Sequence, residues 1–149
     1  MYPILLDIHS VMRWLIVIAG IFVLYRSGRG WFGRRAWTED ERRWGTIFTI
    51  LLDIQLVLGL LLYFVFSPFT TSGFSQGMGD PVSRFFLVEH SSMMILAVII
   101  AHVGSIMVKR AKLESKFKRM FIYYGIALLL ILVAIPWPFS GAAARPWLF

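Results

Sequence analysis

The sequence predicts an all-α fold, an integral membrane four-helix bundle, and three observations support this prediction. Of the 149 residues, 58% are hydrophobic, and the mean hydropathy is +0.74. Soluble domains average roughly 45–50% apolar residues. The apolar residues gather in four long blocks, and most Lys and Arg residues lie beside those blocks. The length suits a single domain over residues 1–149.

Four segments are long enough to cross a bilayer, which takes about 20 predominantly apolar residues. The first segment, 4–25, follows almost directly on the start of the sequence. The second, 44–66, comes after Thr38-Glu39-Asp40-Glu41, a typical helix start, so its helix is expected to begin ahead of the membrane. The third is 84–108. The fourth, 120–139, is free of charges, and Pro136 is expected to end its helix.

The distribution of positive charge predicts the topology. The segments 26–43 and 109–119 contain twelve of the fifteen Lys and Arg residues. The connector 67–83 contains neither, and its Gly and Pro residues are typical of turns. The positive-inside rule places the two basic loops in the cytoplasm, with both termini and the connector on the outer side. The net charge of +7 is thereby explained by topology, and no nucleic-acid partner is expected.

The sequence contains no cysteine. This excludes disulfides, thiolate metal sites, thiol catalysis and covalent c-type haem attachment. It leaves b-type haem open, because histidines can hold that group.

Ionisable residues inside a bilayer are costly and usually face the bundle interior, where they mark functional sites. Eight residues inside the predicted spans are candidates for such sites: Asp7, His9, Arg13, Asp53, Gln55, Glu89, His90 and His102.

His9 and His90 are the strongest candidates for a cofactor site. The first and third helices start on the same side of the membrane. At about 1.5 Å per residue, His9 lies roughly 8 Å and His90 roughly 9 Å from the start of its helix. Two imidazoles at one level are what a haem b iron with two histidine ligands requires, and bundles hold cofactors between facing helices. The alternative is that each histidine simply bonds a neighbouring helix.

Arg13 shares a helix face with His9 because it lies four residues later. It is a candidate to bind a haem propionate, and the alternative is an ion pair with Asp53. His102 lies at a depth comparable to Asp53, which is its expected partner. With Gln55, these two residues are candidates for a proton relay or a quinone contact, and the alternative is an interhelical hydrogen bond.

The remaining candidates have more ordinary interpretations beside the functional one. Asp7 and Glu89 either orient the two histidines or reach water at the rim. Met93 and Met94 are expected to pack rather than to ligate a metal. Ala97, Ala101 and Gly104 have the spacing of a face for close helix packing.

Short motifs along almost the whole chain carry a resemblance to a known family. The chain resembles small four-helix bacterial membrane proteins labelled "cytochrome B", notably those of Bacteroidota. More distantly, it is similar to membrane-type protoporphyrinogen oxidases and copper-resistance D proteins. In the first of these a histidine of the first helix serves the haem, and His9 matches it by position, although the surrounding motif differs. The motifs are His9-Ser10-x-x-Arg13-Trp14, Asp53-x-Gln55-x-x-Leu58-Gly59, Glu89-His90-x-x-Met93-Met94, Ala101-His102 and Ile135-Pro136-Trp137-Pro138.

The resemblance implies haem binding in the bacterial cytoplasmic (inner) membrane. The leading hypothesis is a multi-pass haem b protein for electron transfer, linked to a quinol and working as a subunit of a respiratory or photosynthetic complex. One alternative is a cofactor-free accessory subunit that contacts lipid and other membrane subunits. Another is a haem-dependent membrane oxidoreductase that acts on quinone or porphyrinogen.

Overall fold

Four long helices dominate the computed structural model, which describes residues 1–71 and 73–145. They are α1 (Tyr2–Phe32), α2 (Glu39–Leu61), α6 (Ser91–Lys109) and α7 (Leu113–Ala134). A π-helical turn, η1 (Leu62–Phe66), extends α2, and another, η2 (Phe85–His90), leads into α6. All four helical segments are long and apolar enough to cross a membrane, as the sequence predicts.

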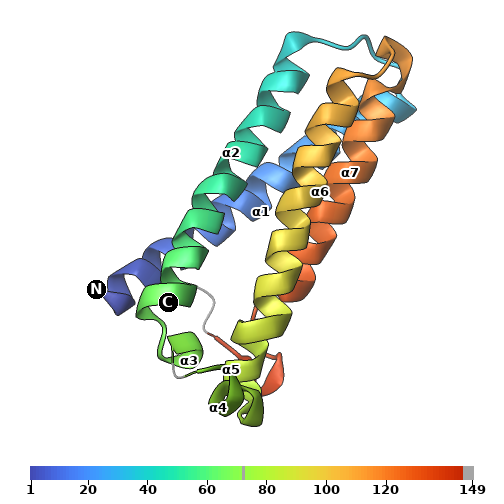
Figure 1. The fold of residues 1–149 in the computed structure, drawn as a ribbon. Coiled ribbons are helices and arrows are strands. Elements are labelled where there is room, and N and C mark those ends of the chain that lie inside the picture. Colours follow the sequence, from blue (N-terminus) through green and yellow to red (C-terminus); the bar gives the residue numbers. More distant parts are fainter. Residues whose placement is uncertain (72, 146–149) are drawn as a thin grey trace.

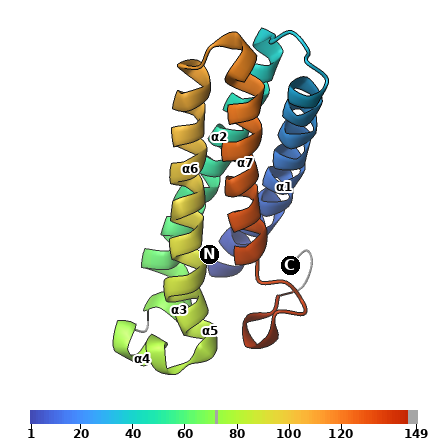
Figure 2. The same ribbon diagram turned by 90° about the vertical axis from the view of Figure 1, so that its right-hand side faces the viewer.

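The four helices form a bundle in which α1 lies between α2 and α7, and α6 lies between the same two helices on the opposite side (Figures 1 and 2). The helices α1 and α6 therefore occupy diagonal positions. They also run in the same direction, because two crossings separate them. Residues at matching depth on these two helices can meet across the centre of the bundle.

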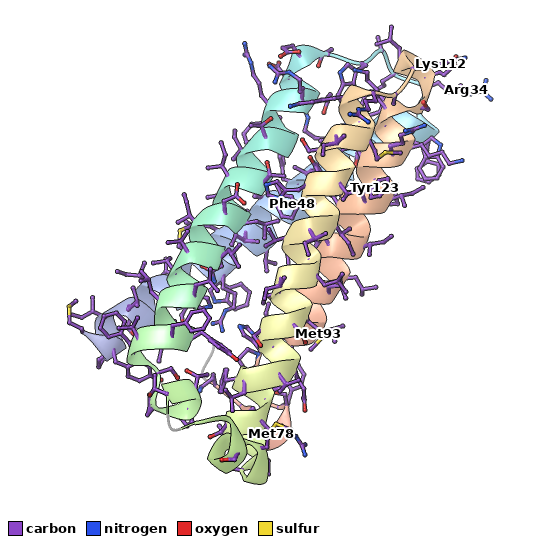
Figure 3. All side chains as sticks on the ribbon, viewed as in Figure 1. Arg34, Phe48, Met78, Met93, Lys112 and Tyr123 are labelled. Atoms are coloured by element: carbon purple, nitrogen blue, oxygen red, sulfur yellow. The ribbon has the colours of Figure 1, made fainter. Side chains whose placement is uncertain are left out.

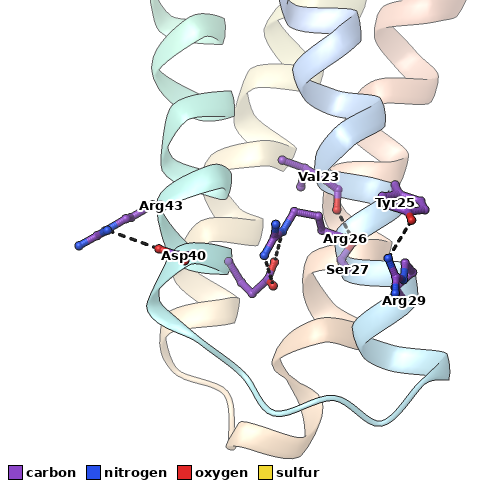
Figure 4. Close-up of polar contacts among 8 residues, drawn as sticks. Val23, Tyr25, Arg26, Ser27, Arg29, Asp40 and Arg43 are labelled. Carbon is purple, nitrogen blue, oxygen red and sulfur yellow. Dashed lines mark hydrogen bonds and ion pairs between the residues drawn. The ribbon is translucent and has the colours of Figure 1, made fainter.

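The α1–α2 and α6–α7 connections lie together at one end of the bundle (Figure 1). Arg34 and Lys112 mark this end, and Met78 marks the other (Figure 3). Here α1 is joined to α2 by two hydrogen bonds of 2.9 and 2.7 Å from the Arg26 guanidinium to the Glu41 carboxylate, shown with the surrounding polar contacts in Figure 4. The carboxylate also lies in the first turn of α2, where the helix dipole favours negative charge.

The opposite end contains three short helices, α3 (Pro68–Thr71), α4 (Phe74–Gly79) and α5 (Pro81–Arg84), where the sequence predicts a connector of turns. Asp80 caps α5 by accepting hydrogen bonds of 2.8 Å from the backbone N–H and the hydroxyl of Ser83. These bonds favour the ionised carboxylate and lower the pKa of Asp80. The start of α1 and the turn η3 (Gly141–Ala143) lie at the same end (Figure 2).

A buried core fills the half of the bundle next to the two basic loops. The Phe48 side chain is fully buried, and Met120 and Tyr124 pack into the same core. The small-residue face predicted on the third helix is present, since Ala97 and Ala101 are fully buried. A Cβ added to Gly104 would lie only 2.5 Å from the Cβ of Tyr123, so α6 and α7 approach each other closely at this point.

The observed helix ends differ from the predicted spans of 4–25, 44–66, 84–108 and 120–139. The helix α2 begins at Glu39 with Thr38 as its N-cap, which confirms the expected start ahead of the membrane. The helices α1 and α7 also extend beyond the apolar blocks on the basic side, to Phe32 and Leu113. A helix satisfies its own backbone in water as well as in lipid, so hydropathy does not mark its end. At its other end, α7 stops at Ala134, because Ile135 precedes a proline and adopts an extended conformation (φ −67°, ψ 128°).

Candidate functional site

A cavity of about 350 Å³ lies in the half of the bundle away from the basic loops. All four long helices and both π-helical turns contribute to its wall, which is predominantly apolar. Its polar lining includes His9, Arg13, Gln55 and His90 from the predicted set, together with Arg145. An apolar cavity of this size with a few convergent polar groups is typical of a ligand site.

The two histidines singled out from the sequence face each other across this cavity. His9 comes from α1 and His90 from the end of η2, so the pair bridges the diagonal of the bundle. Their ring centroids are 6.3 Å apart, and the ring planes make an angle of 63°. The structure thus brings the two imidazoles to one level, in an edge-to-face arrangement.

The orientation of His90 is set by the end of α7. The Nδ1–H of His90 donates a hydrogen bond of 2.8 Å to the carbonyl of Ala134. That carbonyl has no helical partner, because the residue four positions later is Pro138, which lacks an N–H. Since the carbonyl can only accept, Nδ1 carries the proton and Nε2 keeps its lone pair. His90 is therefore prepared to coordinate a metal through Nε2.

Pro136 also lacks an N–H, so the carbonyl of Leu132 has no helical partner either. A neighbouring side chain supplies the missing donor. The carbonyl of Leu132 accepts a hydrogen bond of 2.8 Å from Nε1 of Trp137. The ring of Trp137 in turn lies edge-on to Trp14 of α1, with centroids 6.1 Å apart. The Pro-Trp-Pro sequence thus fixes the chain that follows α7 beside the cavity.

The surroundings of His9 leave room on its cavity side. Gln55 donates a hydrogen bond of 2.9 Å to the backbone carbonyl of His9, which ties α2 to α1 at this level. Within the described part of the chain, Nδ1 of His9 and Oε1 of Gln55 are buried and have no hydrogen-bond partner. Buried polar atoms of this kind call for an explanation such as a bound ion or ligand. Gly59 lines the cavity with its backbone alone. A Cβ added at this position would lie 3.4 Å from Cε1 of His9, at ordinary contact distance.

Two arginines line the cavity. Arg13 lies one turn after His9 on α1, and its guanidinium carbon is 5.4 Å from the ring centroid of Trp14. Arg145 lies over the rings of Phe69 and Phe86, at 5.0 and 5.4 Å. Sequence reasoning missed Arg145, although it is the one basic residue in the segment after residue 139. The two guanidinium groups make the cavity suitable for a ligand that is apolar over most of its area and carries anionic groups.

Asp53 and His102 lie outside the cavity. Oδ1 of Asp53 is 3.3 Å from Nε2 of His102, which confirms the pairing expected from their depth. The side-chain contact that the structure gives to Asp53 thus joins it to His102, and the alternative of an Arg13–Asp53 pair is not the arrangement found. Both side chains are about half exposed on the outer surface of the bundle, so neither faces the two central histidines.

The structure decides between the two interpretations for Glu89 alone among Glu89, Met94 and Asp7. Glu89 lies 3.4 Å from Nε of Arg84 in an exposed ion pair at the rim, rather than orienting a histidine. Met94 lines the cavity. Asp7 lies on α1 and is partly buried.

Comparison of the chain with protein-family models, with curated proteins and with solved structures finds no match.

Proposed function

We propose that this chain is a b-type haem protein that carries single electrons in a membrane, with His9 and His90 as axial ligands of one iron. The observation that supports this most directly is the distance of 6.3 Å between their ring centroids. A bond from a metal to an imidazole nitrogen is about 2 Å long, so imidazoles on opposite sides of one metal hold their ring centres about 6 Å apart.

The cavity suits the rest of the haem. Its wall is apolar over most of its area, and its volume of about 350 Å³ falls within the usual range for ligand sites. Arg13 and Arg145 would pair with the two propionates, because guanidinium groups bind carboxylates through paired hydrogen bonds. When bound, haem supplies one-electron redox chemistry.

The protein's own residues would hold the ligands and tune them. The Ala134 carbonyl orients His90 and raises the basicity of its free nitrogen. Gln55 fixes the backbone at His9, and the apolar wall limits access of water. These groups set the reduction potential through hydrogen bonding and burial.

The proposed place of the protein is the bacterial cytoplasmic membrane. The positive-inside rule puts the basic end of the bundle in the cytoplasm, so the cavity and both termini lie toward the periplasm. A lipid-soluble quinol is the proposed electron donor. The α1–α2 and α6–α7 connections are short, and the connection from α2 to α6 adds only the three short helices α3, α4 and α5. This leaves little surface for a standard soluble interface of about 800 Å² per partner. We therefore propose that the chain works as a subunit of a larger redox complex in the membrane.

A reduced-minus-oxidised visible spectrum, with a pyridine haemochrome assay, tests the proposal on protein purified gently with its lipids. We expect about one haem b per chain, in line with one ligand pair. His9→Ala and His90→Ala should each lose most of the low-spin signal. The matched control is His102→Ala, which removes the third histidine, outside the cavity, and should leave the spectrum unchanged.

Each other outcome has a definite meaning. Protein without haem would overturn the proposal and favour the cofactor-free accessory subunit. Haem that survives both His9→Ala and His90→Ala would overturn the ligand assignment. Steady turnover of quinone or porphyrinogen by the haem-loaded protein would make the chain an oxidoreductase rather than a carrier.

A further inference from the structure

One acid–base pair faces outward from the middle of the bundle. Oδ1 of Asp53 on α2 and Nε2 of His102 on α6 are 3.3 Å apart, and the two side chains are 50% and 46% exposed. Neither residue lines the cavity, so the proposed haem site does not account for them. The pair joins the outer faces of two neighbouring helices.

The depth of this pair makes its exposure costly. Asp53 lies at the centre of the span Glu39–Phe66, and His102 lies about 10 Å from Lys109, at 1.5 Å per residue. In a bilayer both side chains therefore face hydrocarbon, where ionisable groups are rare and usually turn inward. Exposed positions on the other two long helices carry aliphatic residues instead, such as Ile18 on α1 and Leu129 on α7.

Polar side chains at this depth stabilise contacts between transmembrane helices. The flanks of the pair offer the apolar part of such a contact. Ile50 and Val57 lie one turn before and after Asp53 on α2, and Ile99 and Ile106 lie one turn before and after His102 on α6. All four are about half exposed. The α2–α6 face, defined by these four residues and the pair, thus has an aliphatic surface with a polar centre.

We infer that the α2–α6 face is the contact surface of a homodimer, in which the Asp53–His102 pairs of two copies lie against each other. Two copies inserted in the same orientation hold the pair at the same depth, and a twofold axis along the membrane normal brings the faces together. The pair is complementary to itself, because each copy presents one acid and one base. Nδ1 of His102 bonds the carbonyl of Val98 in its own helix. Nε2 is therefore the nitrogen that meets Asp53 of the second copy, and a carboxylate accepts about four hydrogen bonds, enough for both copies.

The absence of native cysteine makes the contact testable by single-cysteine crosslinking in membranes. Ile99→Cys places a thiol on the α2–α6 face. Leu129→Cys is the matched control: Gly104 lies against Tyr123, and counting from there places Leu129 at about the depth of Ile99, on α7. After mild oxidation we expect a disulfide-linked species of twice the chain mass for Ile99→Cys and almost none for Leu129→Cys.

A second comparison separates the polar contact from simple collision. Asp53→Leu combined with His102→Leu removes the pair while leaving the outward surface apolar, so the monomer should keep its fold and its thermal stability. In this background we expect the Ile99→Cys crosslink to fall several-fold.

Four results would overturn the inference: no crosslink at Ile99→Cys, equal crosslinking at Leu129→Cys, a crosslink that persists undiminished without the pair, or a crosslinked species whose mass shows a different protein. The last result would assign the face to another subunit. Haem content does not enter any of these readouts, so failure of the haem proposal and failure of the dimer are distinguishable.

Discussion

The contact between α6 and α7 at Gly104 predicts a measurable cost for adding a single methyl group. In Gly104→Ala the new Cβ would lie 2.5 Å from Cβ and 3.2 Å from Cγ of Tyr123. The Cβ of Tyr123 is fixed to its backbone, so no rotation relieves the overlap. Ordinary contact begins at 3.4 Å, and the two helices must therefore separate by about 1 Å, a change that well-packed interiors resist.

Two opposing contributions set the magnitude. Replacing Gly by Ala inside a helix stabilises by about 1 kcal/mol, whereas overpacking a core costs about 1–3 kcal/mol. Separation at Gly104 also loosens the packing of Tyr124, which lies in the buried core. The steric cost should prevail, giving a net loss of about 1–2 kcal/mol. A loss of 1 kcal/mol lowers the melting temperature by roughly 2–4 °C for a chain of this size.

Thermal unfolding in detergent checks this prediction, with Gly125→Ala as the matched control. Among the described residues, a Cβ at Gly125 would meet only Cδ2 of Leu24, at 3.5 Å, so this variant should be neutral or slightly stabilised. A Gly104→Ala protein as stable as the parent, or an equal loss in Gly125→Ala, would refute the reasoning from close helix contact.

Three further predictions concern the cavity and the two ends of the bundle. Gly59→Leu should fill part of the cavity and lower the haem content measured by haemochrome assay, while Gly59→Ala keeps it; full haem content in the leucine variant would contradict the assignment. Glu41→Gln should destabilise by about 1–3 kcal/mol in thermal unfolding, because the Arg26 guanidinium loses its charged partner; an unchanged melting temperature would show that the pair is dispensable. The stabilisation from the Asp80 cap should be complete above the ordinary carboxyl pKa of 3.8 and should be lost as pH falls through the lower pKa of the folded state. Asp80→Ala should therefore flatten the acid limb of a profile of stability against pH. An unaltered acid limb would exclude the cap as its cause.

Most of the architecture could be predicted because bilayer thickness constrains it. Four apolar blocks of the right length predicted four helices, and the structure confirms them. The pairing of Asp53 with His102 followed from counting residues at a fixed rise, since a helix converts sequence separation into depth.

Other features of the fold escaped prediction for identifiable reasons. The basic-side extensions of α1 to Phe32 and of α7 to Leu113 carry no hydropathy signal. The helices α3 and α5 have only four residues each, too few to show a periodic pattern. The π-helical turns η1 and η2 depend on hydrogen bonds within one turn, which residue composition does not reveal.

The candidate site was predicted in outline, and its supporting groups were not. His9 and His90 could be matched in depth, but depth alone leaves the rotation of each helix open. The acceptor of His90 is a backbone carbonyl at Ala134, freed by Pro138, and a backbone group has no sequence signature. Arg145 reaches the cavity because the chain folds back after Pro136, a path that no local pattern specifies.

The central claim, that one iron is held between His9 and His90, is tested most directly by the electron paramagnetic resonance spectrum of the oxidised protein. With an imidazole on each side, the ferric iron should be six-coordinate and low-spin. His90→Ala should convert it to a high-spin, five-coordinate form, while His102→Ala leaves the spectrum unchanged. A high-spin spectrum in the parent protein, or a low-spin spectrum that survives His90→Ala, would contradict the proposed ligation.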